Sequence, residues 1–352
     1  MPSRRAFLNV VTAVLVLSCA APTFAQVDKP VPVVATFSIL GDMVKRIGGK
    51  HIAVTTLVGP DGDSHVYQPT PADARAVSEA EVLIVNGLQF EGWIDRLIDA
   101  TDFDGIRVVA TDGIEPITFE HHGEDAHDKH AEDDGHKDHD HDHDKHAKGA
   151  DHKDHDHDKH AKSDGHKDHD HEGHDHGVFD PHAWQSPSNA IAYVDNITAA
   201  LAQADPANAA DFYQNRAAYV AEIEVLDAEI REIVASLPAD RRIVVTSHDA
   251  FQYFGRDYGL NFIAPQGLST ESEAAAKDVA HLIQQIRERN IRAVFIENIG
   301  DPRLLKLIAD ETEAVIGGTL YPGALSGSDG PAPTYLDMMR HNATTLVQAL
   351  GS

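Results

Sequence analysis

Cysteine is almost absent from this sequence. The only copy, Cys19, lies close to the N-terminus of a chain of 352 residues. The chain beyond it therefore offers neither a disulfide bond nor a thiolate ligand for zinc. A metal site in that part of the molecule must use histidine and carboxylate side chains. Both are plentiful, with 24 His and 57 Asp and Glu residues.

Positive charge is also scarce. Lysine and arginine together number 29 against 57 acidic residues, which gives a formal net charge of −28. Nucleic acids and anionic membranes are bound by clustered Lys and Arg, so this balance argues against both as partners. It suits a protein that handles cations. Hydrophobic residues make up 42% of the chain, which at this length is enough for the cores of two domains.

The N-terminus lacks a hydrophobic run long enough to cross a bilayer. Its apolar run covers only residues 10–17 and follows Arg4-Arg5. This pattern, with small residues after it, predicts a cleaved signal peptide over residues 1–25 and a periplasmic location. Residues 3–8 also resemble a twin-arginine export signal. The match to a lipoprotein cleavage box before Cys19 is loose, so lipid anchoring there is not expected.

Apolar runs alternate with helical patterns on both sides of a central histidine-rich tract. Runs that are apolar throughout predict buried strands of parallel sheets covered by helices. We therefore expect an α/β protein of two lobes, each with a mostly parallel sheet flanked by helices, joined by one long rigid helix. In the first lobe the expected strands are 31–37, 51–58, 82–85 and 107–110, and the expected helices are 39–47, 93–98 and one that starts at Thr70-Pro71. In the second lobe the expected strands are 243–246, 293–296 and 315–320, and the expected helices are 250–258, 273–289, 303–312 and 334–350.

The domain boundaries follow from these patterns. After the signal peptide at 1–25 we expect an N-terminal α/β lobe at 28–119, a His/Asp-rich disordered loop at 120–177, the end of the N-terminal lobe at 178–205, a linking helix at 206–237 and a C-terminal α/β lobe at 238–352. At about 1.5 Å per residue the linking helix would be roughly 45 Å long. A helix of this length is a rigid connection, so we expect little hinge motion between the lobes.

The tract consists mainly of His, Asp, Lys and Gly, and it holds 18 of the 24 histidines. A His-Lys-Asp-His-Asp-His unit recurs at 136–141, 152–157 and 166–171 with irregular spacing. With no apolar periodicity the tract cannot offset the entropy of folding, and we expect disorder without metal. Its imidazoles should bind Zn²⁺, Ni²⁺ or Cu²⁺ modestly and with poor selectivity. A metal buffer, a ligand relay, a sensor of zinc excess and a solubilising insertion remain open as its role.

His65, His182 and His248 share one kind of position. Each is expected in a loop just after a strand or at the start of a helix, where open α/β sheets bind ligands. Three neutral imidazoles without thiolates favour Zn²⁺ over Mn²⁺ or Mg²⁺. For any one of them alone, a surface or capping histidine is the simpler interpretation. The spacing by itself therefore leaves both interpretations open.

Several motifs surround these histidines in chain order. They are the stretches 64–73, 86–88, 179–184, 245–254, 258–260, 295–297 and 317–321. Together, over essentially the whole chain after the signal peptide, they resemble the zinc and manganese (cluster A-I) substrate-binding proteins of bacterial ABC importers. The resemblance implies a metal in the cleft between two lobes, with His65 and His182 as ligands from the first lobe and His248 from the second. Manganese members carry Glu where His248 stands, so the resemblance favours zinc.

One position departs from that pattern. Many members have an Asp ligand where Gly323 stands in this sequence. The fourth coordination position is then expected to hold water or a carboxylate from nearby, since zinc tolerates three protein ligands plus water. Asp63, Glu297 and Asp329 are the candidates.

The sequence thus predicts a high-affinity zinc-binding protein, not an enzyme, that delivers Zn²⁺ to an ABC permease in the inner membrane. We expect a monomer, further Zn²⁺ in the tract, and a periplasmic zinc chaperone as an additional candidate partner. A manganese or mixed-metal carrier is the alternative of the same class. A zinc-storage protein that acts through the tract is another. A secreted zinc hydrolase using metal-bound hydroxide is the third, but the sequence shows no HExxH helix pair and no evident general base.

Overall fold

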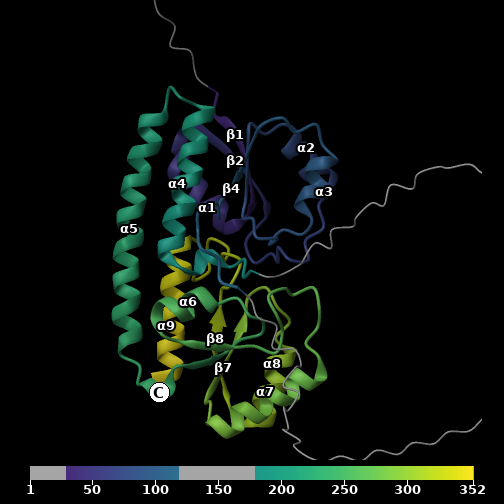
Figure 1. The fold of residues 1–352 in the computed structure, drawn as a ribbon, viewed down its shortest axis with the longest axis vertical. Helices are drawn as coiled ribbons and strands as arrows, with labels where there is room; N and C mark the ends of the chain where they lie inside the picture. Colours follow the sequence, from purple (N-terminus) through teal and green to yellow (C-terminus); the bar gives the residue numbers. More distant parts are fainter. Residues whose placement is uncertain (1–28, 119–178, 352) are drawn as a thin grey trace, which may run out of the picture.

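The computed structural model describes residues 29–118 and 179–351. The predicted signal peptide, Cys19 and the histidine-rich tract lie outside the described residues. The described chain forms two lobes, one above the other in Figure 1, with a long helix running beside both. Within the described ranges, no helix is long and apolar enough to cross a membrane.

The first lobe is built on a parallel sheet with the strand order β2-β1-β3-β4. Its strands are β1 (Val31–Phe37), β2 (Ile52–Val58), β3 (Val82–Val85) and β4 (Ile106–Val109). The two central strands, β1 and β3, are buried along almost their whole length. Burial on both faces explains why their sequences are apolar throughout instead of alternating. All four strands lie within one residue of their predicted positions.

The helices of the first lobe are α1 (Ser38–Gly48), α2 (Pro71–Ser78), α3 (Ile94–Asp99) and α4 (Pro187–Ala204), with 3₁₀ turns η1 (Gly49–His51) and η2 (Ala183–Gln185). Helix α2 begins as predicted. Thr70 is its N-cap and accepts a hydrogen bond from the backbone of Asp73, and Pro71 occupies the first helical position. The cap fixes the end of the loop that follows β2, and this loop carries His65.

The second lobe repeats the strand order of the first. Its strands, in the order β6-β5-β7-β8, are β5 (Ile243–Val245), β6 (Asn261–Ile263), β7 (Ala293–Glu297) and β8 (Val315–Leu320). Its helices are α6 (Gln252–Tyr258), α7 (Ala276–Arg289), α8 (Arg303–Thr312) and α9 (Tyr335–Gly351), preceded by the turn η3 (Ala239–Arg241). The sequence did not predict β6. This strand has only three residues and begins with exposed Asn261, two residues after Gly259, whose φ of 70° ends α6.

Helix α5 (Ala209–Ala235) joins the lobes and packs against α1 and α4 of the first lobe and against α6 and α9 of the second. Its 27 residues span about 40 Å. The helix begins three residues after the predicted start at Pro206, because Asp205 forms a turn that accepts a hydrogen bond from the backbone of Asn208. One face is buried along its length, through Phe212, Tyr219, Ile223, Leu226, Ile230 and Val234.

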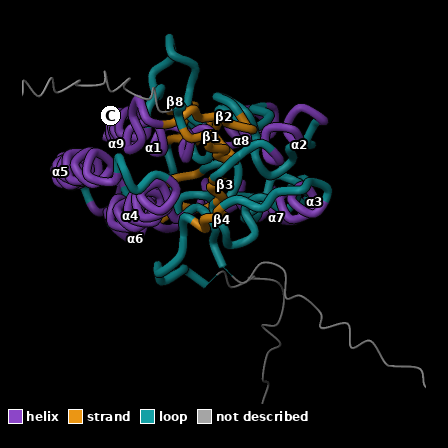
Figure 2. Tube along the Cα trace, turned by 90° about the horizontal axis from the view of Figure 1, so that it is seen from above, coloured by secondary structure: helices purple, strands orange, loops and turns teal. Residues whose placement is uncertain are grey.

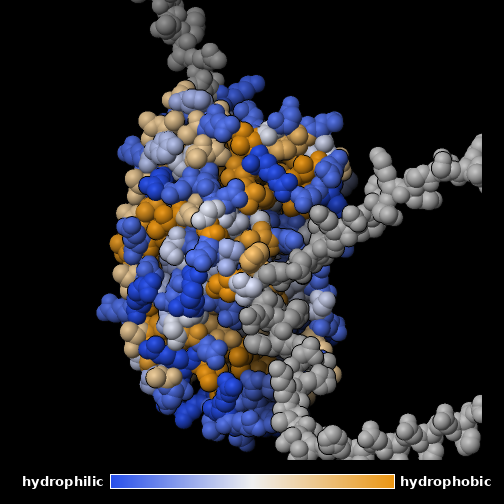
Figure 3. Space-filling view, in the orientation of Figure 1, coloured by the Kyte–Doolittle hydropathy of each residue, from blue (hydrophilic) through white to orange (hydrophobic). Residues whose placement is uncertain are grey.

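One hydrophobic core extends through both lobes, and a smaller separate cluster lies under α7 and α8 of the second lobe. A single cluster of buried residues runs from Phe37 and Trp184 in the first lobe to Phe251 and Met338 in the second. Seen from above in Figure 2, the strands lie between two groups of helices, with α1, α4, α5 and α9 on one side and α2, α3, α7 and α8 on the other. The face shown in Figure 3 is largely hydrophilic, with hydrophobic residues in scattered groups. The shared core keeps the two lobes in register at the level where the three histidines lie.

Candidate metal site

His65 is supplied by the loop between β2 and α2. Its backbone N–H donates to Oδ1 of Asp63 at 2.9 Å, and the carbonyl of the preceding residue, Ser64, accepts a hydrogen bond of 2.8 Å from the indole of Trp93. The ring lies edge-on to Phe90, with 4.8 Å between the ring centroids. With these contacts His65 is 7% exposed.

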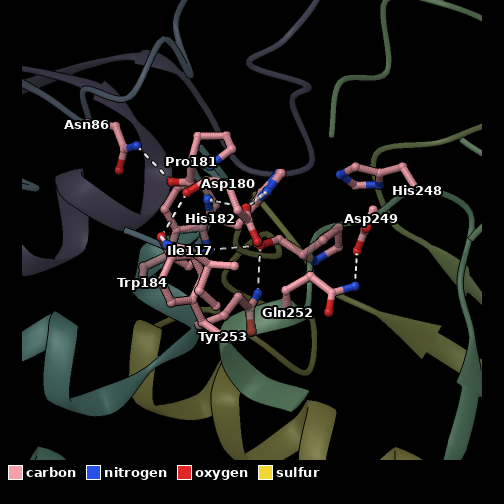
Figure 4. Close-up of polar contacts among 12 residues, drawn as sticks. Asn86, Ile117, Asp180, Pro181, His182, Trp184, His248, Asp249, Gln252 and Tyr253 are labelled. Carbon is pink, nitrogen blue, oxygen red and sulfur yellow. Dashed lines mark hydrogen bonds and ion pairs between the residues drawn. The ribbon is translucent and has the colours of Figure 1, made fainter. Parts of the chain in front are cut away.

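His182 is fully buried just before the turn η2. Asp180 holds it twice, since one carboxylate oxygen lies 2.9 Å from the backbone nitrogen and 2.8 Å from Nδ1 of the ring. Asn86 of the first lobe donates to the carbonyl of Pro181 at 2.9 Å, and Tyr253 of α6 donates to the carbonyl of Asp180 at 2.9 Å, as Figure 4 shows. The segment is therefore fixed from both lobes.

His248 follows β5 and is also fully buried. Glu297, at the end of the neighbouring strand β7, accepts hydrogen bonds on Oε1 from the backbone of Ser247 at 3.0 Å and of His248 at 3.2 Å. Its Oε2 lies 2.5 Å from Nδ1 of the His248 ring. A carboxylate on Nδ1 orients an imidazole and leaves Nε2 free to bind a metal.

The three predicted histidines come together between the lobes. Each offers one nitrogen, and these atoms all lie within 4.8 Å of one another. Nε2 of His65 and Nε2 of His182 are 3.3 Å apart, while Nε2 of His248 is buried and has no hydrogen-bond partner. In Figure 4, His182 and His248 come from opposite sides of the close-up. A single small cation placed among them could contact all three rings.

Burial controls the protonation of this cluster. It lowers the pKa of His65 and of His182 well below the usual value of a histidine, which keeps both rings neutral with a lone pair available. Burial lowers the pKa of His248 too, but the charge of Glu297 and its hydrogen bond outweigh that effect and the pKa is raised. Burial raises the pKa of the Asp180 carboxyl to about 7.

None of the three candidates for a fourth ligand joins the histidine cluster within the described chain. Both oxygens of Glu297 serve the His248 segment. Asp63 uses one oxygen for the backbone of His65 and the other for Thr270. Asp329 is exposed and lies 3.5 Å from the hydroxyl of Ser328. The roles that Glu297 and Asp63 do have, orienting one histidine and shaping the loop of another, were not predicted.

Gly323 lies against the aromatic wall of the site. A Cβ added there would meet Ile299, Phe90 and Trp184 at 3.7 to 3.9 Å, which is ordinary van der Waals contact. The carbonyl of the preceding residue, Pro322, accepts hydrogen bonds from the indole of Trp184 at 2.8 Å and from the side chain of Gln185 at 2.7 Å. The backbone at Gly323 is thus held against Phe90 and Trp184, the rings that contact His65 and His182, with room for a Cβ.

Sequence reasoning missed the residues behind the histidines. Asn86, Asp180 and Tyr253 all fall within the motifs around the histidines, but the motifs do not show which residues are in contact. The sequence did offer a signal for the contact of Asp180 with His182, because the two residues are separated only by Pro181. Tyr253 had none, since its contact with Asp180 joins residues 73 positions apart.

Two α/β lobes with a shared core, one long helix beside both, and a buried imidazole cluster between them define a binding protein with a cleft site. A family model described as the periplasmic component A of the zinc-uptake complex (ZnuA) matches residues 33–349, and the chain belongs to that family. It is a metal-binding substrate-binding protein of an ABC importer, a class that works with a permease and an ATPase in the membrane. Members of this family are transport proteins and not enzymes, which removes the hydrolase alternative.

Relatives with different metals in their names are similar to this chain. The iron-binding protein YfeA of Yersinia pestis is 31% identical over 92% of this chain and 87% of its own length. The manganese-binding lipoprotein MntA of Halalkalibacterium halodurans is 28% identical over 98% of this chain and 97% of its own. Among solved structures, the periplasmic zinc-binding protein TroA of Treponema pallidum has 27% identity and a TM-score of 0.73, covering 92% of this chain and 99% of that one. The shared fold therefore does not by itself decide the metal.

Proposed function

We propose that this protein captures Zn²⁺ in the periplasm through His65, His182 and His248 and delivers it to an ABC permease. The observation that carries the proposal is the set of three buried imidazole nitrogens within 4.8 Å of one another, with no carboxylate among them in the described chain. Mn²⁺ prefers carboxylate and water ligands, whereas neutral imidazole suits Zn²⁺. The carboxylates of Asp180 and Glu297 contact Nδ1 of His182 and of His248, the ring nitrogens that face away from the cluster.

The rest of the proposal concerns the setting of this site. The N-terminal segment acts as a signal peptide, with twin-arginine export as a variant, and without lipid at Cys19. The protein works as a monomer, with a zinc chaperone as a further candidate partner, and the tract binds additional Zn²⁺ as an accessory. A manganese or mixed-metal carrier is the second candidate, and the names of the iron- and manganese-binding relatives favour it. Storage of zinc by the tract is the third.

Competition titration with a chelator tests the proposal. Mature protein lacking residues 121–176 is titrated with Zn²⁺ beside its His182→Ala variant, and Mn²⁺ is titrated in parallel. We expect one tight zinc equivalent that the substitution weakens at least 100-fold, and weaker binding of Mn²⁺. Tighter binding of Mn²⁺ than of Zn²⁺ would favour the mixed-metal alternative. Loss of tight binding on deletion of the tract would contradict the three-imidazole site and favour storage.

A further inference from the structure

The loop that carries His65 is attached to both lobes. On the side of the first lobe, the indole of Trp93 holds the carbonyl of Ser64 at 2.8 Å. On the side of the second lobe, the hydroxyl of Thr270 donates to Oδ2 of Asp63 at 2.6 Å. The other oxygen of the same carboxylate accepts the backbone N–H of His65 at 2.9 Å. Asp63 thus connects Thr270 to His65 through a single side chain.

A second acidic residue of this loop is also held by the second lobe. The backbone N–H of Asp61 donates to the carbonyl of Leu325 at 2.8 Å, and its carboxylate accepts a hydrogen bond of 2.9 Å from Asn298. Asp61 has a φ of 54°, in the left-handed region that side-chain-bearing residues rarely adopt. Such a conformation persists where the surroundings impose it. Contacts with the second lobe therefore help to set the shape of the loop.

His65 differs from the other two histidines in what supports its ring. His182 and His248 each have a carboxylate on Nδ1 that belongs to their own lobe, Asp180 and Glu297 respectively. In the described part of the chain, no such carboxylate stands behind His65. Its position depends on the loop backbone and on the edge contact with Phe90. It is the ligand that a movement of the loop would displace most easily.

His65 is also the ligand beside open space. A cavity of about 870 Å³ adjoins the site, and His65 is the only one of the three histidines in its lining. The second lobe contributes Leu268, Ser269 and Glu271 to the same lining, the residues on either side of Thr270. The contact between Asp63 and Thr270 therefore lies at the edge of this cavity, on the side where His65 meets open space.

We propose that Asp61 and Asp63, with their partners Asn298 and Thr270, form a cross-lobe clasp that positions His65 and limits the rate at which the metal leaves. When the lobes separate the clasp opens, and His65 is the first ligand to withdraw, while His182 and His248 keep their carboxylates. Thr270 is a positioning residue in this scheme, since it acts on the metal only through Asp63 and His65. The inference rests on the proposed function, because it assumes that the three histidines bind the transported cation.

The required movement is small. A hydrogen bond is lost beyond about 3.5 Å, so an opening of about 1 Å at this point breaks the contact between Asp63 and Thr270. A displacement of this size is compatible with the stiff helix α5 and the shared core. A permease that pulls the lobes slightly apart would thereby reduce the site from three ligands to two.

The test measures the rate of zinc release. Zinc-loaded protein is mixed rapidly with excess chelator for the wild type, Thr270→Val and Thr270→Ser. Valine matches threonine in shape but lacks the hydroxyl, whereas serine retains it. We expect Thr270→Val to release zinc at least tenfold faster than the wild type and Thr270→Ser to release it at nearly the wild-type rate, with similar melting temperatures of the metal-free proteins. Equal rates for Thr270→Val and the wild type would overturn the clasp, as would equal acceleration by both variants.

A double-mutant comparison shows whether the effect passes through His65. In a His65→Ala background, Thr270→Val should cause no further increase in the release rate, because the residue that the clasp positions is gone. A persisting tenfold effect would mean that Thr270 acts by another path and would overturn the inference. Failure of the proposed function has a different signature: wild-type protein without the tract would bind no tight zinc equivalent, and His182→Ala would change nothing.

Discussion

Two carboxylates, Glu297 and Asp180, each hold one of the histidines by defined hydrogen bonds. Glu297 uses one oxygen for two backbone N–H groups and the other for the ring of His248. Asp180 uses a single oxygen for both the backbone and the ring of His182. Partners of this kind fix the orientation of the ring and raise its basicity, and their loss typically weakens metal affinity about 10–100-fold.

Glu297→Gln is expected to weaken zinc binding by about that factor, roughly 10–100-fold. The substitution turns one of the two acceptor oxygens into an amide donor, which then faces a donor group of the His248 segment. Chelator competition measures the change, with Asp301→Asn as the control, because Asp301 is an exposed carboxylate shortly after the same strand. An unchanged zinc affinity in Glu297→Gln would show that Glu297 does not support the metal site.

Gly323→Asp is expected to move the preference of the site toward Mn²⁺. The Cβ position has room beside Phe90 and Trp184, and a carboxylate there would add the hard ligand that manganese prefers. We expect the ratio of the Mn²⁺ to the Zn²⁺ dissociation constant to fall at least tenfold. Without metal the buried carboxylate is unpaired, so the variant should melt at a lower temperature than the wild type.

Gly323→Ala is the matched control for that substitution. It adds the Cβ without the charge, and its metal preference should equal that of the wild type. If Gly323→Asp leaves the ratio of dissociation constants unchanged, the space beside Gly323 does not face the cation.

The motifs around the three histidines predicted that these residues come together, but not the contacts that support them. The bond between His248 and Glu297 spans 49 residues and forms because β5 and β7 are neighbours in the sheet, with β6 at its edge. The sequence did not predict β6, so this order could not be derived. The contact between Asp63 and Thr270 spans 207 residues and depends on how the two lobes meet.

A short antiparallel contact joins the two chain segments at the ends of the histidine-rich tract. Thr118 pairs with Phe179 in an isolated bridge, and the backbone N–H of Asp180 donates to the carbonyl of Ile117 at 2.9 Å. The side chain of Tyr253 bridges the neighbouring residues Ile117 and Asp180. Its hydroxyl accepts a hydrogen bond from the N–H of Ile117 at 3.0 Å and donates one to the carbonyl of Asp180 at 2.9 Å. We call these paired residues, 117–118 and 179–180, the stem of the tract. The stem lies only a few residues before His182.

The stem predicts that the tract can be removed cleanly. Thr118 and Phe179 already face each other across an antiparallel bridge, so a short turn can join the two segments in place of the tract. We expect a protein with residues 120–177 replaced by Asn-Gly to melt at nearly the same temperature as the wild type and to retain one tight zinc equivalent. Only weaker equivalents should disappear in calorimetric titration. Loss of the tight equivalent would mean that the tract supplies part of the site.

Most helices and strands were predictable because apolar runs and caps are local signals. The strands of the first lobe and the Thr70 cap of α2 lie where the sequence places them. The errors occur where local signals are weak. Strand β6 is three residues long, and the turn before α5 depends on the side chain of Asp205, not on the proline that follows it.

At the scale of the whole molecule, we expect α5 to limit how far the lobes can move. It contacts helices of both lobes along about 40 Å. The pair of substitutions Ala221→Gly and Ala228→Gly should soften it, since both residues are exposed and each glycine costs roughly 1 kcal/mol in a helix interior. We expect faster zinc release, because states with separated lobes become more populated. Ala280→Gly in α7 is the control outside the linking helix, and as a single exposed glycine it costs roughly 1 kcal/mol, about half the cost of the pair.

Rapid mixing with chelator and thermal melting separate the two effects. A softer α5 should raise the release rate, whereas Ala280→Gly should lower stability and leave the rate unchanged. If both proteins release zinc at the same rate after correction for stability, the linking helix does not restrain the lobes.

The stem also has a consequence for how this gene can change. Because Thr118 and Phe179 are neighbours, the intervening chain leaves and returns at one place, whatever its length. The free energy needed to bring the two ends of a connecting segment together rises by only about 0.6 kcal/mol for each doubling of its length. Copies of the His-Lys-Asp-His-Asp-His unit can therefore be gained or lost by replication slippage with little effect on folding. We expect closely related strains to differ more in the number of these units than in the rest of the sequence.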